Sequence, residues 1–175
     1  MTSILINTGS LNGYKLIKRF EGCKLFAYQC SAGIWTIGYG HTVGVKKGDK
    51  ITLEQADKFF ETDIKLFEMA LNKAIKDINP LTQNQYDALL SLAYNAGIGA
   101  TSEIIEYLRS KEKLDKVINI EETKKFNQYR FHDKNNRKEV FFVMFLFCKW
   151  INASGKPIEG LYNRRVEEAM LFLNI

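Results

Sequence analysis

The segment 18–42, KRFEGCKLFAYQCSAGIWTIGYGHT, changes from a helical to a sheet-like pattern and decides the fold. Upstream of Gly22, apolar residues recur at helical spacing, which predicts a short helix that ends at Glu21. Ser10 is the expected N-cap of this helix, and Gly22 is its stop. The apolar positions of this helix are Leu11, Tyr14, Ile17 and Phe20.

Beyond Gly22, aromatic and β-branched residues alternate with glycines, which predicts a hairpin. The alternation sends Trp35 and Ile37 to one face and leaves Thr36 on the other. Because glycines flank Thr36, we expect its side chain to face open space.

The helical period returns after Gly48. Thr52 and Thr82 each begin a capping-box signature, with a glutamine three residues later. A long helix is predicted from an apolar stripe of Leu53, Ala56, Phe60, Ile64, Phe67, Leu71 and Ile75. A second helix ends at Gly97, and further helices are expected at 102–109, 137–151 and 160–173. The apolar run 140–147 is too short to span a bilayer, and we expect it, with Phe147 and Trp150, in the core.

The 175 residues, 46% of them hydrophobic and 26% charged, indicate one domain over 1–175 that buries its own core. The predicted class is α+β, with a small sheet lobe at about 22–50, a larger helical lobe and a ligand cleft between them. The net charge of +5 favours anionic partners. Basic residues are scattered rather than striped, which disfavours nucleic acid.

The three cysteines, Cys23, Cys30 and Cys148, are too few for a disulfide scaffold. Neither they nor His41 and His132 have metal-ligand spacing, so we expect neither metal nor cofactor. Cys23 and Cys30 could pair if the hairpin brings them close.

Glu21 is the only acidic residue between positions 21 and 48. A carboxyl group at a helix C-terminus faces the negative end of the helix dipole, which favours its neutral form. Such a group suits general-acid chemistry, whereas the alternative is a solvated residue at a helix end.

The order of residues adds a resemblance. Glu21 is followed after eight residues by Cys30 and after five more by Thr36, within FEG and WTIGYGHT. This resembles the phage lysozyme (endolysin) family, glycoside hydrolase family 24, in which Asp is commoner than Cys at the middle position. Weaker similarities follow at ITLEQAD (51–57), LSLAYNAGIG (90–99) and GLYNRRVEEAMLF (160–172). The resemblance implies a lysozyme-like fold and cleavage of the β-1,4 bond between N-acetylmuramic acid and N-acetylglucosamine in peptidoglycan.

The resemblance also implies roles for single residues. Glu21 would protonate the glycosidic oxygen, and Thr36 would hold the water on the other face of the sugar. Cys30 could act as a nucleophile, as a base or as a thiol that orients water, and the alternative is a small buried hydrophobe.

Further residues follow from the same family pattern. Asn95 would contact sugar or the catalytic network, or cap a helix. Arg164 and Arg165, with Asn95, are the candidate substrate-binding residues; one of the two arginines would approach Glu21, and the alternative for at least one of them is a solvated helix charge. His41 would be a structural hydrogen-bonding residue beside the cleft. The segment 111–150 fits the family least well and could hold substrate selectivity.

The sequence therefore predicts a phage or prophage muramidase that acts as a monomer. With no export segment visible, we expect it in the host cytoplasm until a partner such as a holin permeabilises the membrane and gives it access to the wall. Two alternatives remain: a lytic transglycosylase, which needs only one Glu and gives 1,6-anhydro products, and an inactive wall-binding protein.

Overall fold

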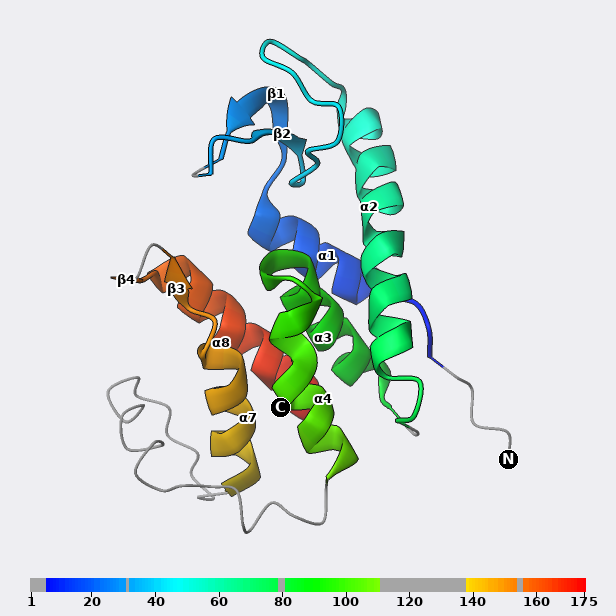
Figure 1. Cartoon of the computed structure of the whole chain (residues 1–175), viewed down its shortest axis with the longest axis vertical. Helices are drawn as coiled ribbons and strands as arrows, with labels where there is room; N and C mark the ends of the chain where they lie inside the picture. The colour runs from blue at the N-terminus through cyan, green and yellow to red at the C-terminus, as the bar shows by residue number, and fades with distance from the viewer. Residues whose placement is uncertain (1–5, 31, 79–80, 111–137, 154–155) are drawn as a thin grey trace.

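The computed structural model describes residues 6–30, 32–78, 81–110, 138–153 and 156–175, which form an α+β fold (Figure 1). Most of these residues are helical, and a two-stranded sheet follows the first helix. In chain order the elements are α1 (Leu11–Glu21), β1 (Lys24–Gln29), β2 (Trp35–Gly38), α2 (Leu53–Ala74), α3 (Gln83–Ala96), η1 (Ile98–Thr101), α4 (Ser102–Arg109), α7 (Lys138–Cys148), β3 (Asn152–Ala153), β4 (Lys156–Pro157) and α8 (Glu159–Leu173).

The predicted small sheet lobe is confirmed. Strands β1 and β2 pair antiparallel, with Tyr28 opposite Thr36 and a register shift between Lys24 and Tyr28. An isolated bridge between Phe26 and Lys50 attaches the following loop to β1. Figure 1 shows this lobe apart from the main body of helices, to which α1 and α2 connect it.

Helix α3 is the centre of the helical lobe. Every residue from Tyr86 to Ala93 is buried, as expected for a helix with neighbours on all sides. Those neighbours are α1, α2, η1 and α8, and α7 packs against the outer side of α8. The central position of α3 gives α1 and α8 a common support, and these are the helices that hold the site.

Local capping signals fix where the helices begin. The Ser10 side chain accepts a hydrogen bond from the Gly13 amide, and both threonine capping boxes form, at Thr52 and at Thr82. Gly22 ends α1 with a φ of +64°, a backbone conformation that glycine adopts without strain. These predicted boundaries are therefore confirmed.

Packing overrides the sequence pattern at three positions. Leu53, assigned to the apolar stripe of α2, is 55% exposed, whereas Glu68 of the same helix is buried. Phe147 lies in the core as predicted, but Trp150 is 42% exposed because α7 ends at Cys148 and the chain turns outward. The short β3–β4 pair has no counterpart among the predicted elements.

The described residues contain no helix that is both long enough and apolar enough to cross a bilayer. The predictions for His132 and for most of the segment 111–150 concern residues 111–137, which lie outside the described part of the chain.

Candidate active site

Glu21 lies at the end of α1 and is fixed by a guanidinium group. Its Oε1 accepts a hydrogen bond of 2.5 Å from Nη1 of Arg164, and the Glu21 side chain is 20% exposed. Oε2 faces Gly40, where an added Cβ would lie 4.0 Å from this oxygen and 4.0 Å from the Tyr94 hydroxyl. The carboxyl group is thus held through one oxygen, and a glycine leaves space beside the other.

The prediction about the charge of Glu21 considered the helix dipole alone. The structure adds the guanidinium group of Arg164, which attracts negative charge at short range. The Glu21 carboxyl group thus lies between the C-terminal end of α1 and a buried guanidinium group whose other contacts are on α3 and α8.

Cys30 begins the turn between β1 and β2. Its carbonyl accepts a hydrogen bond from the Gly33 amide at 2.8 Å, and its amide donates to the Ile34 carbonyl at 3.0 Å. Hydrogen bonds from the backbone amides of Ile34 and Ala32, and from the Thr36 hydroxyl, lower the pKa of the Cys30 thiol. This geometry resembles an Asx-turn, in which an Asp side chain accepts from the amide two residues onward. A thiolate and a carboxylate can therefore fill the same local role at this position.

Thr36 lies beside Cys30 but does not face open space. Its side chain is 4% exposed, and its hydroxyl donates to the Ile34 carbonyl at 3.0 Å. The same hydroxyl lies within hydrogen-bonding reach of the Cys30 sulfur. The expected exposure is therefore wrong, because the short hairpin folds its turn over the Thr36 side chain.

Tyr28 connects the hairpin to the end of α1. Burial, followed by the charges of Glu21 and Cys30, raises the pKa of the Tyr28 hydroxyl. Both groups therefore lie within electrostatic range of one phenol. That Glu21, Cys30 and Thr36 act together stays a prediction.

Arg164 is also bound on the side away from Glu21. It is 3% exposed; Nε donates to Glu168 at 2.9 Å, and Nη2 donates to the Ser91 carbonyl at 3.1 Å. Arg165 is 0% exposed; Nη1 lies 2.9 Å from Glu168, and Nη2 donates to Asn95 at 2.5 Å. Neither arginine is solvated, so the alternative of a solvated helix charge holds for neither of them.

The exposed residue of this group is Asn95, near the end of α3. Its side-chain oxygen accepts a hydrogen bond from Arg165, and a role of Asn95 in sugar binding or in catalysis stays a prediction. A buried chain of contacts leads from Glu21 through Arg164, Glu168 and Arg165 to Asn95.

Two of the residues in and around this chain, Ser91 and Glu168, were not predicted from the sequence. Glu168 stands four residues after Arg164 and three after Arg165, which is the spacing of helical ion pairs. That spacing was the available signal. Ser91 offered none, because its partners come from α8.

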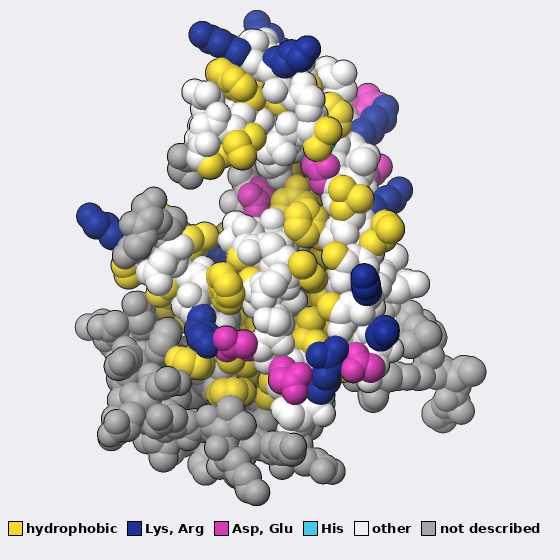
Figure 2. All heavy atoms as spheres, in the orientation of Figure 1, with side chains coloured by type: hydrophobic (Ala, Val, Ile, Leu, Met, Phe, Trp, Pro, Cys, Tyr) yellow, Lys and Arg dark blue, Asp and Glu magenta, His cyan; other side chains and the backbone are white. Residues whose placement is uncertain are grey.

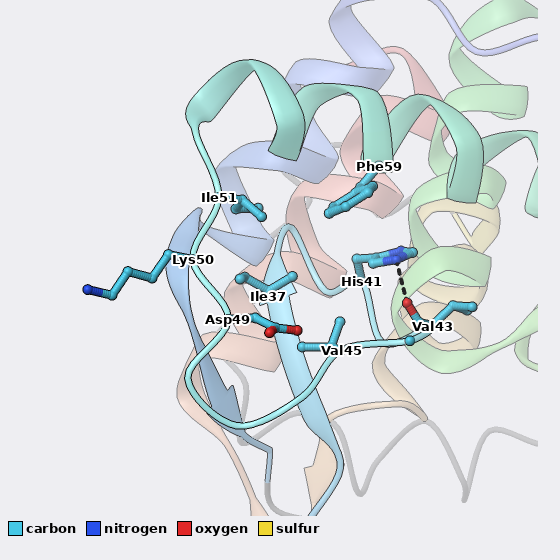
Figure 3. Close-up of a pocket in the computed structure, with 9 residues that line it drawn as sticks. Ile37, His41, Val43, Val45, Asp49, Lys50, Ile51 and Phe59 are labelled. Carbon is cyan, nitrogen blue, oxygen red and sulfur yellow. Dashed lines mark hydrogen bonds between the residues drawn. The ribbon is translucent and has the colours of Figure 1, made fainter.

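His41 is hydrogen-bonded, as expected. Nδ1 lies 2.8 Å from a carboxylate oxygen of Asp63, Nε2 lies 3.0 Å from the Val43 carbonyl, and the ring stacks on Phe59 at 4.3 Å. Figure 3 shows His41, Val43 and Phe59 beside a pocket between β2, the following loop and α2. None of Glu21, Cys30 and Thr36 lines this pocket, and the contacts of His41 with Asp63 and Phe59 brace the chain after β2 against α2.

The sulfur atoms of Cys23, Cys30 and Cys148 are free, so the Cys23–Cys30 disulfide considered from the sequence is absent. Among the described residues, no group of three or more His, Cys, Asp and Glu side chains could hold a metal ion.

The surface is hollowed between the sheet lobe and the end of the helical body that bears β3 and β4 (Figure 2). A sheet lobe and a helical lobe on either side of a hollow, joined by a helix that ends in a carboxyl group, define a lysozyme-like fold. Residues 18–134 match the phage lysozyme family.

Individual relatives and solved structures support the same family. An endolysin of Acyrthosiphon pisum secondary endosymbiont phage 1 is 40% identical over 169 residues, 93% of this chain and 96% of that protein. The endolysin structure from Escherichia coli O157:H7 phage FAHEc1 matches with a TM-score of 0.66 and 36% identity, over 94% of this chain and 92% of that one. The muramidase domain of SpmX from Asticaccaulis excentricus matches with a TM-score of 0.68 and 30% identity, over 94% and 96%. The chain belongs to the phage lysozyme family.

Proposed function

We propose that this protein is an endolysin that hydrolyses the β-1,4 bond between N-acetylmuramic acid and N-acetylglucosamine in bacterial peptidoglycan. The observation on which this rests is the Glu21 carboxyl group, held by Arg164 through one oxygen and open to Gly40 on the other side. Family membership and the similarity to endolysins and to a muramidase domain support the same substrate.

In the proposed reaction, Glu21 donates its proton to the glycosidic oxygen as the bond to the leaving sugar breaks. Cys30, as a thiolate, supports the positive charge that develops on the sugar ring. Together with Thr36 it holds the water that attacks the other face, and the Cys30 thiolate accepts the proton that this water loses as its oxygen bonds to the sugar. The lowered pKa of Cys30 supports this role, because a thiolate supplies the negative charge that a neutral thiol lacks.

The test is a digestion of purified peptidoglycan by wild type, Glu21→Gln, Cys30→Ser and Cys30→Asp, with the fragments identified by mass spectrometry. We expect reducing ends from wild type, a loss of about 100-fold or more in Glu21→Gln, and retained activity in Cys30→Asp. Glu61→Gln, at an exposed carboxylate on α2, is the matched control and should behave as wild type.

The second candidate is a lytic transglycosylase, in which the muramic acid hydroxyl replaces water. It is favoured by the thiol at position 30, because that reaction needs only Glu21. If the wild-type digestion gives products with 1,6-anhydro ends, the protein is a lytic transglycosylase and the proposed hydrolysis is wrong. If neither wild type nor Glu21→Gln releases fragments under conditions where both are folded, both enzymatic candidates fail and the inactive wall-binding alternative is the one left.

The proposal keeps three expectations from the sequence: access to the wall through a holin, a monomeric state, and residence in the host cytoplasm before membrane permeabilisation. Co-expression with and without a holin, followed by culture turbidity, tests the first of them. Lysis without the holin would contradict it.

A further inference from the structure

We propose that Glu168 is a positioning residue for the general acid, which shares Arg164 with Glu21 and thereby limits how strongly the guanidinium holds the acid in its charged form. This inference rests on the proposed function, because it assigns a role to Glu168 only if Glu21 donates a proton. Glu168 itself has no route to a substrate, since it is 0% exposed.

The contacts of Glu168 are those of a residue that fixes Arg164. Oε1 accepts from Nε of Arg164 at 2.9 Å and from the Ser91 hydroxyl at 2.6 Å. Arg164 uses Nη1 on the far side of its guanidinium plane for Glu21. A planar guanidinium held at Nε and at Nη2 has a fixed direction for Nη1. The position of the Glu21 carboxyl is therefore set by contacts on α3 and α8.

The charges of this group balance in pairs. Glu21 and Glu168 supply two carboxyl groups, and Arg164 and Arg165 supply two guanidinium groups. Burial raises the pKa of Glu168, while the two guanidinium groups and Ser91 act in the opposite direction. Because two buried cations beside a single carboxylate would be costly, we infer that Glu168 is ionised in the folded protein.

Few other titratable groups face these four residues. Towards Glu21 they are Tyr28 from β1 and Tyr94 from α3, and beyond Tyr28 lies Cys30, which every variant below leaves unchanged. Towards Glu168 and Arg165 the additional group is Cys148 from α7, whose pKa burial raises to about 12. These phenols and this thiol are neutral at the pH of the assay. Glu168 is therefore the one described carboxylate besides Glu21 that contacts Arg164.

Removing the charge of Glu168 has a definite consequence. In Glu168→Gln, Glu21 becomes the sole carboxylate in contact with Arg164, and Arg165 loses its carboxylate contact. The acid then loses its proton at lower pH, so the alkaline limb of the pH–activity profile moves to lower pH. A purely structural role would lower the melting temperature without moving this limb.

The experiment measures kcat and KM on purified peptidoglycan across both limbs of the profile for Glu168→Gln and Glu168→Asp. The matched control is Glu167→Gln, which removes a partly exposed carboxylate on the same helix whose partner is Arg19. We expect Glu168→Gln to shift the alkaline limb down by about one pH unit, with a corresponding loss in kcat of about tenfold on that limb and an unchanged KM. Glu168→Asp should restore the position of the limb, and Glu167→Gln should match wild type.

Wild type and Glu21→Gln are assayed in the same series to separate the two proposals. If wild type gives no Glu21-dependent cleavage, the proposed function fails. If wild type does cleave through Glu21, but the pH–activity profile of Glu168→Gln superposes on that of Glu167→Gln, the proposed role of Glu168 is overturned. Should Glu168→Gln not fold, Ser91→Ala, which removes the donor to Oε1, should shift the limb in the same direction by less; an unshifted limb in that variant also overturns the proposal.

Discussion

At the scale of single residues, Cys30 and Cys148 have the same side chain in opposite surroundings. Cys148 is buried at the end of α7, and burial raises the pKa of its thiol to about 12. Cys30 is partly exposed, and the amides of Ile34 and Ala32 together with the Thr36 hydroxyl lower the pKa of its thiol. The reactivity of the two thiols towards electrophiles should therefore differ, because the thiolate is the reactive form.

Iodoacetamide should accordingly alkylate Cys30 in the native protein at neutral pH and leave Cys148 unmodified. Mass spectrometry of the peptides after timed quenching measures both rates. Thr36→Val, which removes the hydroxyl from the sulfur, should raise the pH at which Cys30 reacts at half its maximal rate. Equal rates at Cys30 and Cys148 would contradict the environments described above.

The acid limb of the activity profile tests whether the thiolate works in turnover. If it does, activity falls as the pH drops through the Cys30 pKa, because protonation removes the charge. Cys30→Asp should shift this limb to lower pH, since a carboxyl group ordinarily titrates near pH 4. Initial rates of peptidoglycan solubilisation across the acid range measure the shift. An unmoved limb would show that the charge at residue 30 does not govern this side of the profile.

Much of the residue-scale site could be predicted, because Glu21, Cys30 and Thr36 lie within one short segment whose spacing is visible in the sequence. The sequence could not assign Arg164 and Arg165, which are adjacent and identical in type. Both pair with Glu168 on their own helix, whereas the partners that distinguish them, Glu21 and Asn95, come from α1 and α3, and such long-range contacts leave no local pattern. Thr36 was misassigned because strand alternation describes a flat sheet, whereas this hairpin is short and closed by a tight turn.

At the scale of elements, the beginning of α1 is fixed by a buried carboxylate of α3. Asp87 is 2% exposed and accepts from the Ser10 amide at 2.8 Å and from the Ser10 hydroxyl at 2.5 Å. The N-cap of α1 thereby becomes a tertiary contact. The two helices come close here because Gly13 has no side chain at the point of contact.

Gly13→Ala should destabilise the protein, because the added Cβ would lie 2.5 Å from Cγ of Asp87. We expect a loss of about 1–3 kcal/mol in the free energy of unfolding, measured by urea denaturation. Gly99→Ala is the matched control, since nothing lies within 4 Å of a Cβ at that position. A similar stability of the two variants would contradict the close approach.

A second element-scale prediction concerns the capping box of α2. Thr52→Ala removes the acceptor of the Gln55 amide and should cost about 1 kcal/mol of stability. The control is Thr62→Ala, an exposed position inside the same helix, where alanine has the higher helix propensity and should cost nothing. Chemical denaturation of the two variants and wild type measures the difference. Equal losses would refute a capping role for Thr52.

Helix boundaries were predictable because a cap depends on residues only three apart in the chain. A single substitution such as Thr52→Ala tests a cap for the same reason. The inward face of α2 was less predictable. Leu53 fits the apolar stripe but lies in the first turn, beyond the reach of the core, whereas Glu68 is drawn inward by the Gly9 amide and the Tyr14 hydroxyl.

At the scale of the whole molecule, three tyrosine hydroxyls connect the elements around the site. Tyr14 of α1 donates to Glu68 of α2 at 2.6 Å. Tyr86 of α3 donates to Asn72 of α2 at 2.9 Å, and Tyr94 donates to the Tyr39 carbonyl, after β2, at 2.8 Å. Hydrogen bonds donated by tyrosine hydroxyls thus join α1 and α3 to α2, and also join α3 to the chain that follows β2.

These tyrosines predict alkaline unfolding. Burial raises the pKa of Tyr14, Tyr86 and Tyr94 above the ordinary value, so their contribution to stability is complete below a pH of about 10. It is lost as the pH rises further, because the unfolded state then releases protons that the folded state retains. Urea denaturation at increasing pH should show this loss, and tyrosinate absorbance should appear together with unfolding. Tyr86→Phe should lose less stability over the same range, and a loss equal to that of wild type would contradict this source of the pH dependence.

The ion pair between Glu21 and Arg164 joins residues that are 143 positions apart. During translation, Glu21, Cys30 and Thr36 leave the ribosome long before the guanidinium that orients the acid has been made. A nascent chain, or one cut short by an early stop codon, therefore has Glu21 without Arg164, and if Glu21 is the acid, as proposed, bond cleavage awaits synthesis of α8.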